Sequence, residues 1–219
     1  MLTVREAIAR RRSIRSFLPD PLPEGAIVEL LEAARLAPSG SNRQPWRFIV
    51  VTDAGEKKKL RALSVNQRFI EEAPVVFICF ADITTLGKEA GRVRWAEFEQ
   101  AGVLETLSGL FADPAFRRAM EALPEPSRGQ AAAYATANAF IAVEHLVLMA
   151  TALGLGSCWV GALGGPGELN EIFGLPDHLV PVALIPVGYT EKWPSQRPRL
   201  RLEEILLRPL PVPSPATAG

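Results

Sequence analysis

The feature that most constrains this fold is a long stretch, from Ala131 to Gly156, in which Glu144 is the only formally charged residue. A helix of this length is long enough to cross a bilayer. Polar side chains are spread along it, however, and such groups are costly in hydrocarbon. They are Tyr134, Thr136, Asn138, Glu144, His145 and Thr151. We therefore expect no membrane span. We expect a helix buried in the core and, because it has too little polar surface for a monomer, in a large interface as well.

The composition argues against several classes of function. Lys plus Arg and Asp plus Glu both number 24, and zero net charge argues against nucleic-acid binding, although cations cluster at 10–15. Two cysteines exclude a disulfide framework or a Cys-rich zinc site, and two histidines exclude a multi-histidine metal site. We therefore expect no metal, and we expect a cofactor to carry the chemistry.

The N-terminal segment has no apolar core of signal-peptide length, so we expect a cytoplasmic protein. Thr3 and Glu6 have the spacing of a capping box that opens a helix. Apolar periodicity and turn residues predict the remaining elements. Helices are expected at 3–12, 24–37, 53–63, 129–153, 168–173 and 202–207, with a mixed helical region at 86–123 that breaks at Pro114 and Pro124. Strands are expected at 46–51, 75–81, 157–163 and 180–189. This mixture predicts an α+β or α/β sandwich.

Two common motifs are missing from the sequence. It has neither a G-x-x-x-x-G-K-[ST] phosphate loop nor a G-x-S-x-G nucleophile elbow. Gly154-Leu155-Gly156 has the start of a dinucleotide-binding fingerprint, but Trp159 stands in the place of the third glycine. We interpret the glycines as the C-terminal cap of the long helix.

Two N-terminal segments contain residue types that suit a ligand. Arg11-Arg12-Ser13-Ile14-Arg15 follows a helix, and guanidinium groups match phosphate. The alternative is a solvated helix end whose cations complement the helix dipole. The segment 38–46 places small residues and neutral hydrogen-bonding side chains before Trp46, which suits a ring with amide-like edges. The alternative there is a plain turn between a helix and a strand.

Two later segments add weaker signals. In the segment 156–163 an expected strand ends in glycine, which would expose backbone N–H groups over a flat ligand. The alternative is a core strand. Cys158 is not expected to be a nucleophile, because no histidine or cation lies near it in sequence to lower its pKa. Arg197-Pro198-Arg199 is, by itself, a charged loop.

Together and in this order, these segments resemble the nitroreductase family of FMN-dependent oxidoreductases. The residues that carry the resemblance are Arg11 to Arg15, the run 37–46, the run 154–163, Pro186-Val187-Gly188-Tyr189 and Arg197-Pro198-Arg199. The resemblance covers about Val4 to Ile205. It implies an α+β fold, namely a three-layer α-β-α sandwich with a central, mostly antiparallel sheet. It also implies an intertwined homodimer that binds FMN at its interface.

The resemblance implies roles for individual residues as well. The FMN phosphate would be held by Arg11, Arg197 and Arg199. Arg12 and Ser13 would line the flavin, and Arg15 would lie near its pyrimidine edge, where a cation stabilises the reduced ring. The partner chain would contribute Pro38, Ser39, Gly40, Ser41 and Asn42. Val160, Gly161 and Ala162 would face the ring near N5, and Gln44 and Trp159 complete the expected cofactor-binding set. No side chain is expected to be catalytic, because the flavin carries the redox chemistry.

The chain departs from the family pattern in two places. Some family members have Glu where Gly161 stands, and the segment of about 83–128 has no family motif. We interpret residues 1–208 as one domain with a variable insertion at 83–128 on the substrate side of the flavin, followed by a Pro-rich tail at 209–219. Aromatic residues of the insertion would form a hydrophobic wall or pack between helices; they are Trp95, Phe98, Phe111 and Phe116. Arg68 is a further candidate to reach the flavin.

The resemblance implies an enzyme with a ping-pong mechanism. NAD(P)H would reduce FMN and leave, and a nitroaromatic or a quinone would then take the electrons as the small-molecule acceptor. Two alternatives stay open. Relatives dehalogenate iodotyrosines or fragment the flavin to dimethylbenzimidazole, and the latter resemble this chain at its RR-S-x-R and Q-P-W segments. The other alternative is a non-catalytic flavin-binding redox sensor.

Overall fold

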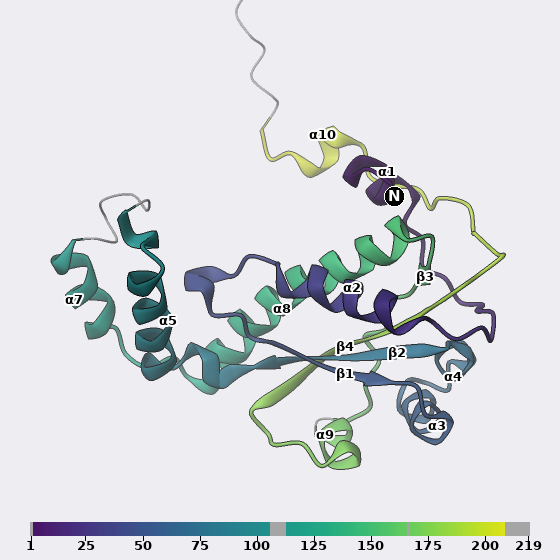
Figure 1. Ribbon diagram of the computed structural model, residues 1–219, viewed down its shortest axis with the longest axis horizontal. Helices are drawn as coiled ribbons and strands as arrows, with labels where there is room; N and C mark the ends of the chain where they lie inside the picture. The colour runs from purple at the N-terminus through teal and green to yellow at the C-terminus, as the bar shows by residue number, and fades with distance from the viewer. Residues whose placement is uncertain (1, 106–112, 166, 209–219) are drawn as a thin grey trace, which may run out of the picture.

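Four strands form one sheet in the order β1-β2-β4-β3, and all neighbouring strands pair antiparallel. They are β1 (Trp46–Val51), β2 (Val75–Asp82), β3 (Gly156–Ser157) and β4 (Leu179–Gly188). The computed structural model describes residues 2–105, 113–165 and 167–208. In Figure 1 the sheet lies between two layers of helices. The expected α+β sandwich with a mostly antiparallel sheet is therefore confirmed.

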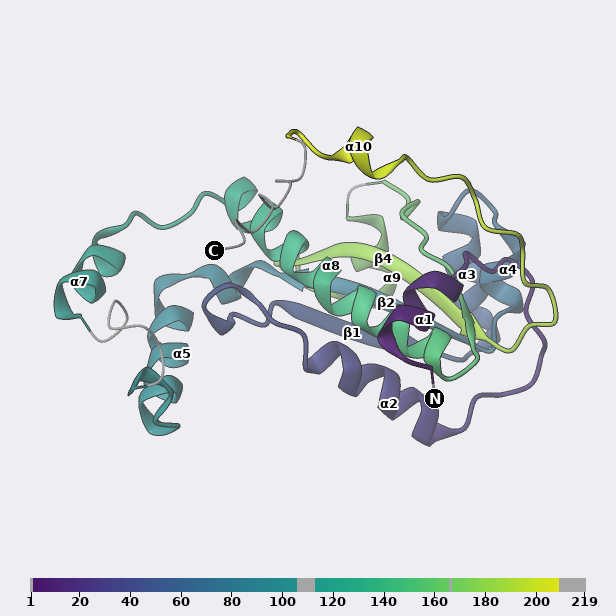
Figure 2. The same cartoon turned by 90° about the horizontal axis from the view of Figure 1, so that it is seen from above.

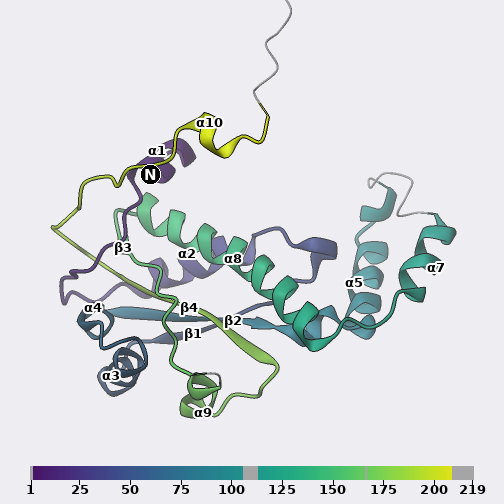
Figure 3. The same ribbon diagram turned by 180° about the vertical axis from the view of Figure 1, so that it is seen from behind.

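The two helical layers cover opposite faces of the sheet (Figures 1 and 3). On one side α2 (Glu24–Arg35) and α8 (Arg128–Ala152) cover the sheet, and α1 (Val4–Arg10) packs on α8 farther from the strands. The other layer consists of α3 (Ala54–Leu63), α4 (Arg68–Glu72) and α9 (Glu168–Phe173). Strand β2 is buried along its whole length, because Phe77 and Cys79 pack toward the first layer while Ile78 and Phe80 pack toward the second. A strand covered on both faces needs an unbroken apolar run, which is what the sequence has at this position.

The helix ends follow the predicted capping chemistry. The Thr3 side chain accepts a hydrogen bond from the Glu6 backbone N–H, and the Glu6 carboxylate accepts one from the Thr3 N–H at 2.8 Å. The Asp53 carboxylate accepts a hydrogen bond from the Glu56 N–H at 2.9 Å. Gly154 follows the last turn of α8 with a φ of +78°. Gly154 therefore caps the helix, as predicted, whereas Gly156 begins strand β3.

Helix α8 packs on the sheet and α2, and α1 lies over its C-terminal part (Figure 2), while other parts of its surface stay uncovered. By length and composition it would pass as a membrane span, but half of its apolar window is buried inside the fold. Its uncovered surface exposes Tyr134, Phe140 and Ile141. These exposed apolar residues are the surface that the expected subunit interface would cover, and that interface stays a prediction.

The expected strand at 157–163 is wrong in extent, because β3 ends at Ser157. The Cys158 N–H still donates to the Pro186 carbonyl oxygen at 3.3 Å, but Pro186 has no N–H to complete the pair. One isolated bridge follows, in which Val160 and Leu184 exchange two hydrogen bonds of 3.0 Å. The chain then leaves the sheet at Gly161.

The segment of about 83–128 extends away from the sheet at one end of α8 (Figures 1 and 2). Its described elements are η2 (Ile83–Leu86), α5 (Lys88–Gln100), η3 (Val103–Glu105) and α7 (Pro114–Ala122). Pro114 begins α7, where Asp113 caps the helix and the first turn needs no proline N–H, and α7 ends at Ala122, just before Pro124. Near the C-terminus the short helix α10 (Leu202–Ile205) forms, as expected, whereas α4 was not predicted.

Truncation of a buried leucine tests the packing of the central strands. Leu184 on β4 is fully buried, whereas Leu207 is fully exposed. We expect Leu184→Ala to lower the free energy of unfolding by about 2–5 kcal/mol, because it leaves a cavity between β2 and the second helical layer. Leu207→Ala is the matched control and should change it by less than about 0.5 kcal/mol. Urea unfolding monitored by circular dichroism measures both, and equal effects would contradict this packing.

Candidate functional site

The two ends of the described chain meet at a cavity of about 570 Å³. Residues that follow α1 line one side, and residues that follow β4 line the other. They are Arg11, Arg12, Ser13, Arg15, Ser16, Glu191, Lys192, Trp193, Pro194, Ser195, Arg197 and Arg199. Among these lining residues Glu191 is the single carboxylate, so the cavity is strongly cationic in a chain of zero net charge. A second cavity, of about 740 Å³, adjoins it and shares Arg12, Trp193 and Pro194.

The sheet edge holds the arginine segment in place. After α1 the chain runs beside β3, where Ser13 and Ser157 form a parallel bridge and the Ile14 N–H donates to the Ser157 carbonyl oxygen at 2.9 Å. Ile14 is fully buried. Its neighbours Ser13 and Arg15 both line the cavity, because side chains alternate along an extended segment.

Four of the cavity arginines have identifiable contacts within the chain, and one of them, Arg199, donates from Nη1 to the carbonyl oxygens of Arg197 and Pro198 at 3.3 and 3.2 Å. The Arg12 Nη1 donates to the carbonyl oxygens of Ala9 and Arg11, both at 2.8 Å. The Arg15 guanidinium lies 5.9 Å from the centre of the Phe69 ring, over its face. The Arg11 Nε lies 3.9 Å from Glu144 Oε1. These contacts leave most guanidinium donors available to a ligand.

The loop at 38–44 is held by α8 and has an unusual backbone. Ser41, Asn42 and Gln44 all have φ near +50°. Such conformations are costly for residues with a side chain and persist only where the surroundings enforce them. Here the Asn138 Oδ1 accepts from the Gly40 N–H at 2.9 Å, and the Ser39 Oγ accepts from the Gln44 N–H at 2.9 Å. A Cβ on Gly40 would lie 1.7 Å from the Tyr134 hydroxyl oxygen, so any larger residue there would force the Tyr134 side chain to move.

Trp159 packs against the hydrophobic core and directly precedes the segment that leaves the sheet at Gly161. Its Nε1–H donates to Glu144 Oε2 at 3.0 Å, and its ring packs edge to face on Phe140 with centroids 5.6 Å apart. Val160 is buried, and Gly161 is exposed with open space around its Cα. Gly161 therefore presents bare backbone directly after two anchored residues.

The described chain brings together part of the predicted set and leaves the rest outside the cavity. Arg11, Arg12, Ser13, Arg15, Arg197 and Arg199 line it. The predicted residues that do not line it are Pro38, Ser39, Gly40, Ser41, Asn42, Gln44, Trp159, Val160, Gly161 and Ala162. Sequence reasoning missed the lining residues Ser16 and 191–195. Their position between the recognised segments is the signal that could have included them.

Trp95 of the insertion contacts α7 across the gap between the two helices. The Arg117 guanidinium lies 4.6 Å from the centre of the Trp95 ring and also pairs with Glu99 on α5. Trp95, Phe98 and Phe116 do not line either cavity, and Phe111 lies outside the described residues. Arg68 is mostly exposed, pairs with Glu72 and lines neither cavity.

Arg43 connects the loop at 38–44 to the insertion. Its Nη1 donates to the carbonyl oxygens of Thr85 and Gly87, both at 3.0 Å, at the point where η2 passes into α5. Burial lowers the pKa of Arg43, but an arginine stays charged. The loop and the insertion are therefore joined through one partly buried guanidinium.

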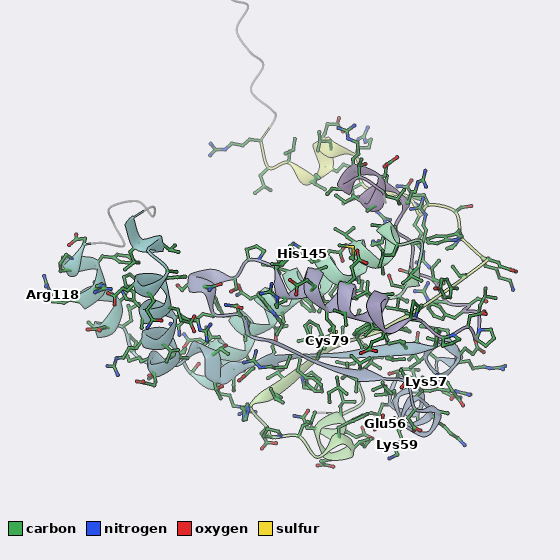
Figure 4. The ribbon with its side chains drawn as sticks, viewed as in Figure 1. Glu56, Lys57, Lys59, Cys79, Arg118 and His145 are labelled. Atoms are coloured by element: carbon green, nitrogen blue, oxygen red, sulfur yellow. The ribbon has the colours of Figure 1, made fainter. Side chains whose placement is uncertain are left out.

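Neither thiol has the environment of a nucleophile. Cys79 lies in the sheet beneath α8 and α2 (Figure 4), and burial raises its pKa well above the ordinary value. Burial also raises the pKa of Cys158, although Arg15 and Arg11 partly offset this effect. Among the described residues no group of three or more His, Cys, Asp or Glu could hold a metal ion.

The chain matches the model of the Nitroreductase family over residues 8–189. The chain belongs to the nitroreductase family. It is 38% identical over 210 residues to a Thermus thermophilus protein named NADH dehydrogenase. The match covers 94% of this chain and 96% of the relative. It is 28% identical to the Bacillus subtilis FMN reductase [NAD(P)H], over 94% of this chain and 73% of the relative.

Solved structures of the nitroreductase family share this fold. The structure of a putative nitroreductase from Exiguobacterium sibiricum, in complex with FMN, superposes with a TM-score of 0.77 and 25% identity. The match covers 94% of this chain and 97% of that one. A nitroreductase family protein from Streptococcus pneumoniae superposes with a TM-score of 0.73 and 25% identity, over 94% of this chain and 100% of that one.

The two hydrogen bonds of Arg43 predict that removing its guanidinium lowers the stability of the protein. We expect Arg43→Gln to lower the free energy of unfolding by about 1–3 kcal/mol, because two partly buried carbonyls lose a charged donor. Arg92→Gln, made in the same protein, is the matched control. Arg92 pairs with Glu89 on the exposed surface of α5 and should contribute less than about 1 kcal/mol. Urea unfolding compares the two, and equal losses would contradict the proposed connection.

The raised thiol pKa values predict slow chemical labelling. At about pH 8, close to the ordinary thiol pKa of about 8.5, both cysteines should stay protonated and buried in the native protein. A disulfide reagent should therefore label neither thiol natively and both in denaturant. Rapid native labelling of one thiol, located by mass spectrometry after digestion, would contradict the described burial.

Proposed function

We propose that this chain is a cytoplasmic FMN-dependent oxidoreductase that oxidises NAD(P)H and reduces an organic acceptor such as a nitroaromatic or a quinone. The observation that carries the proposal is the arginine-lined cavity formed by the two ends of the chain. Its volume of about 570 Å³ lies within the range of cofactor sites. Its guanidinium donors suit a phosphate, and they are concentrated in one cavity of a chain whose net charge is zero.

The residues of the cavity fit the parts of FMN. Arg11, Arg197 and Arg199 would hold the phosphate, with Arg12 and Ser13 beside the flavin. Arg15 would lie at the pyrimidine edge, where a cation stabilises negative charge on the reduced ring. When bound, FMN would supply the redox chemistry by accepting a hydride from NAD(P)H and giving electrons to the acceptor.

A homodimer would complete the site. The loop at 38–44 is held by the N-terminal half of α8 through Asn138, whereas Glu144 and the cavity residue Arg11 meet at its C-terminal half. Two copies that pair their exposed α8 faces about a twofold axis would bring the loop of one beside the cavity of the other. The partner would thus contribute Pro38, Ser39, Gly40, Ser41, Asn42 and Gln44.

The remaining residues would form the wall beside the reacting edge of the ring. Trp159 and Val160 are anchored, and Gly161 and Ala162 follow them with accessible backbone. A backbone N–H at this position would hold a hydrogen bond near N5 without an acidic side chain. We propose residues 1–208 as the single FMN-binding domain, with 83–128 as a variable insertion. The tail at 209–219 lies outside the described residues.

The absorption of the purified protein tests the cofactor and the reaction together. We expect yellow protein whose flavin is identified as FMN after heat release. Anaerobic NADH or NADPH should bleach it, and a quinone or a nitrofuran should restore the colour. Bound FMN that neither nucleotide reduces would instead favour a redox sensor or different flavin chemistry, in which iodide release or loss of flavin under oxygen would then be measured. Colourless protein that refuses reconstitution would overturn the proposal.

Neutralising one cavity arginine tests the phosphate contact. We expect Arg197→Gln to weaken FMN binding about 10- to 100-fold, because a charge-assisted hydrogen bond contributes about 1.5–3 kcal/mol. Arg201→Gln is the matched control, because Arg201 lies on the same segment but does not line the cavity. Titration of flavin-free protein, followed by quenching of FMN fluorescence, gives both dissociation constants. Equal values would contradict the assignment of Arg197.

A further inference from the structure

Glu144 is the carboxylate that interrupts the uncharged stretch of α8, and it contacts two separate parts of the candidate site. Its Oε2 accepts a hydrogen bond of 3.0 Å from the Trp159 indole N–H. Its Oε1 lies 3.9 Å from the Arg11 Nε, which is an ion pair but too long for a hydrogen bond. One side chain therefore joins the arginine cavity to the segment that begins at Trp159.

Glu144 and Phe140 hold Trp159 from two directions. They are one helical turn apart on α8 and so lie on the same face. Glu144 fixes the indole N–H, and Phe140 packs edge to face against the ring at 5.6 Å. The next residue, Val160, is bridged to Leu184. These contacts determine where the backbone leaves the sheet at Gly161.

The charge of Glu144 has the opposite effect on the cavity. A carboxylate beside Arg11 partly neutralises this guanidinium and would repel a phosphate bound to it. The side chain of Glu144 is 42% exposed, so the repulsion is screened by solvent and salt. The hydrogen bond to Trp159 needs an acceptor oxygen, and an amide oxygen would serve as well as a carboxylate.

We propose that Glu144 is a positioning residue whose hydrogen bond to Trp159 orders the flavin-facing segment, while its charge lowers the affinity of the cavity for phosphate. This inference rests on the proposed FMN site. It separates two contributions that one residue makes to the same ligand, because the first acts on the ring and the second on the phosphate. Riboflavin, which lacks the phosphate, distinguishes them.

The experiment titrates flavin-free wild type, Glu144→Gln and Glu144→Leu with FMN and with riboflavin, at low and high salt. Glu144→Gln keeps the acceptor and removes the charge. We expect it to bind FMN about three- to tenfold more tightly at low salt, with a smaller gain at high salt and no change for riboflavin. Glu144→Leu also loses the acceptor, so we expect it to bind both flavins about three- to tenfold more weakly than Glu144→Gln.

Trp159→Phe supplies a second test that does not depend on the folding of Glu144→Leu. It removes the indole donor, so we expect it to weaken riboflavin binding as Glu144→Leu does, and the double variant should be no weaker than either single one. Circular dichroism and thermal unfolding check that each variant is folded.

Several results would overturn the inference. Weaker binding of both flavins by Glu144→Gln would show that the charge itself is needed, and additive effects of Glu144→Leu and Trp159→Phe would show that the two side chains act separately. If Glu144→Gln left FMN binding unchanged at low salt, the claim that the Glu144 charge lowers the affinity for phosphate would be wrong. Wild-type protein that binds neither flavin would overturn the proposed function, and this inference with it; the other outcomes leave the proposed function standing.

Discussion

The packing of α8 on one face of the sheet places several parts of the candidate site. Its N-terminal half holds the loop at Gly40 through Asn138, and its C-terminal half carries Glu144 beside Arg11 and Trp159. Because a buried helix is a rigid spacer, one chain holds the loop and the arginine cavity apart. The same packing leaves apolar residues of α8 exposed, and in the proposed homodimer the partner chain would cover them and complete the site.

Positive and negative charges balance over the whole chain, but positive charge dominates the lining of the cavity. Folding brings arginines that precede residue 16 and follow residue 196 into one cavity, and like charges at close range oppose that arrangement. Glu191 in the lining and Glu144 beside it offset the repulsion in part. A bound phosphate would offset much more of it. The cavity therefore has an electrostatic reason to bind an anion, independent of any comparison with other proteins.

The backbone of the loop at 38–44 is strained, and contacts with the rest of the fold must offset the free energy of that strain. Three residues with φ near +50° each cost of order 1 kcal/mol, and the hydrogen bonds at Gly40 and Ser39 hold them in that state. Arg43 adds a connection to the insertion. A loop that is already held in one shape loses little entropy when it meets a ligand, which favours tight binding by preorganisation.

Burial of the run in β2 and of much of α8 could be predicted from local sequence, because both segments are too apolar to be stable unless they are covered. The sequence also specified the helix caps at Thr3, Asp53 and Gly154, since capping depends on a few neighbouring residues. Local signals did not predict α4, and they overextended β3, whose ladder depends on Pro186 in a distant strand. The resemblance to a family implied that Arg11, Arg197 and Arg199 act together, and the folded chain brings them into one cavity. The position of Glu144 between Arg11 and Trp159 had no signal in the sequence and follows from the packing of α8. Such contacts join residues far apart in sequence, and their geometry depends on how every intervening element packs.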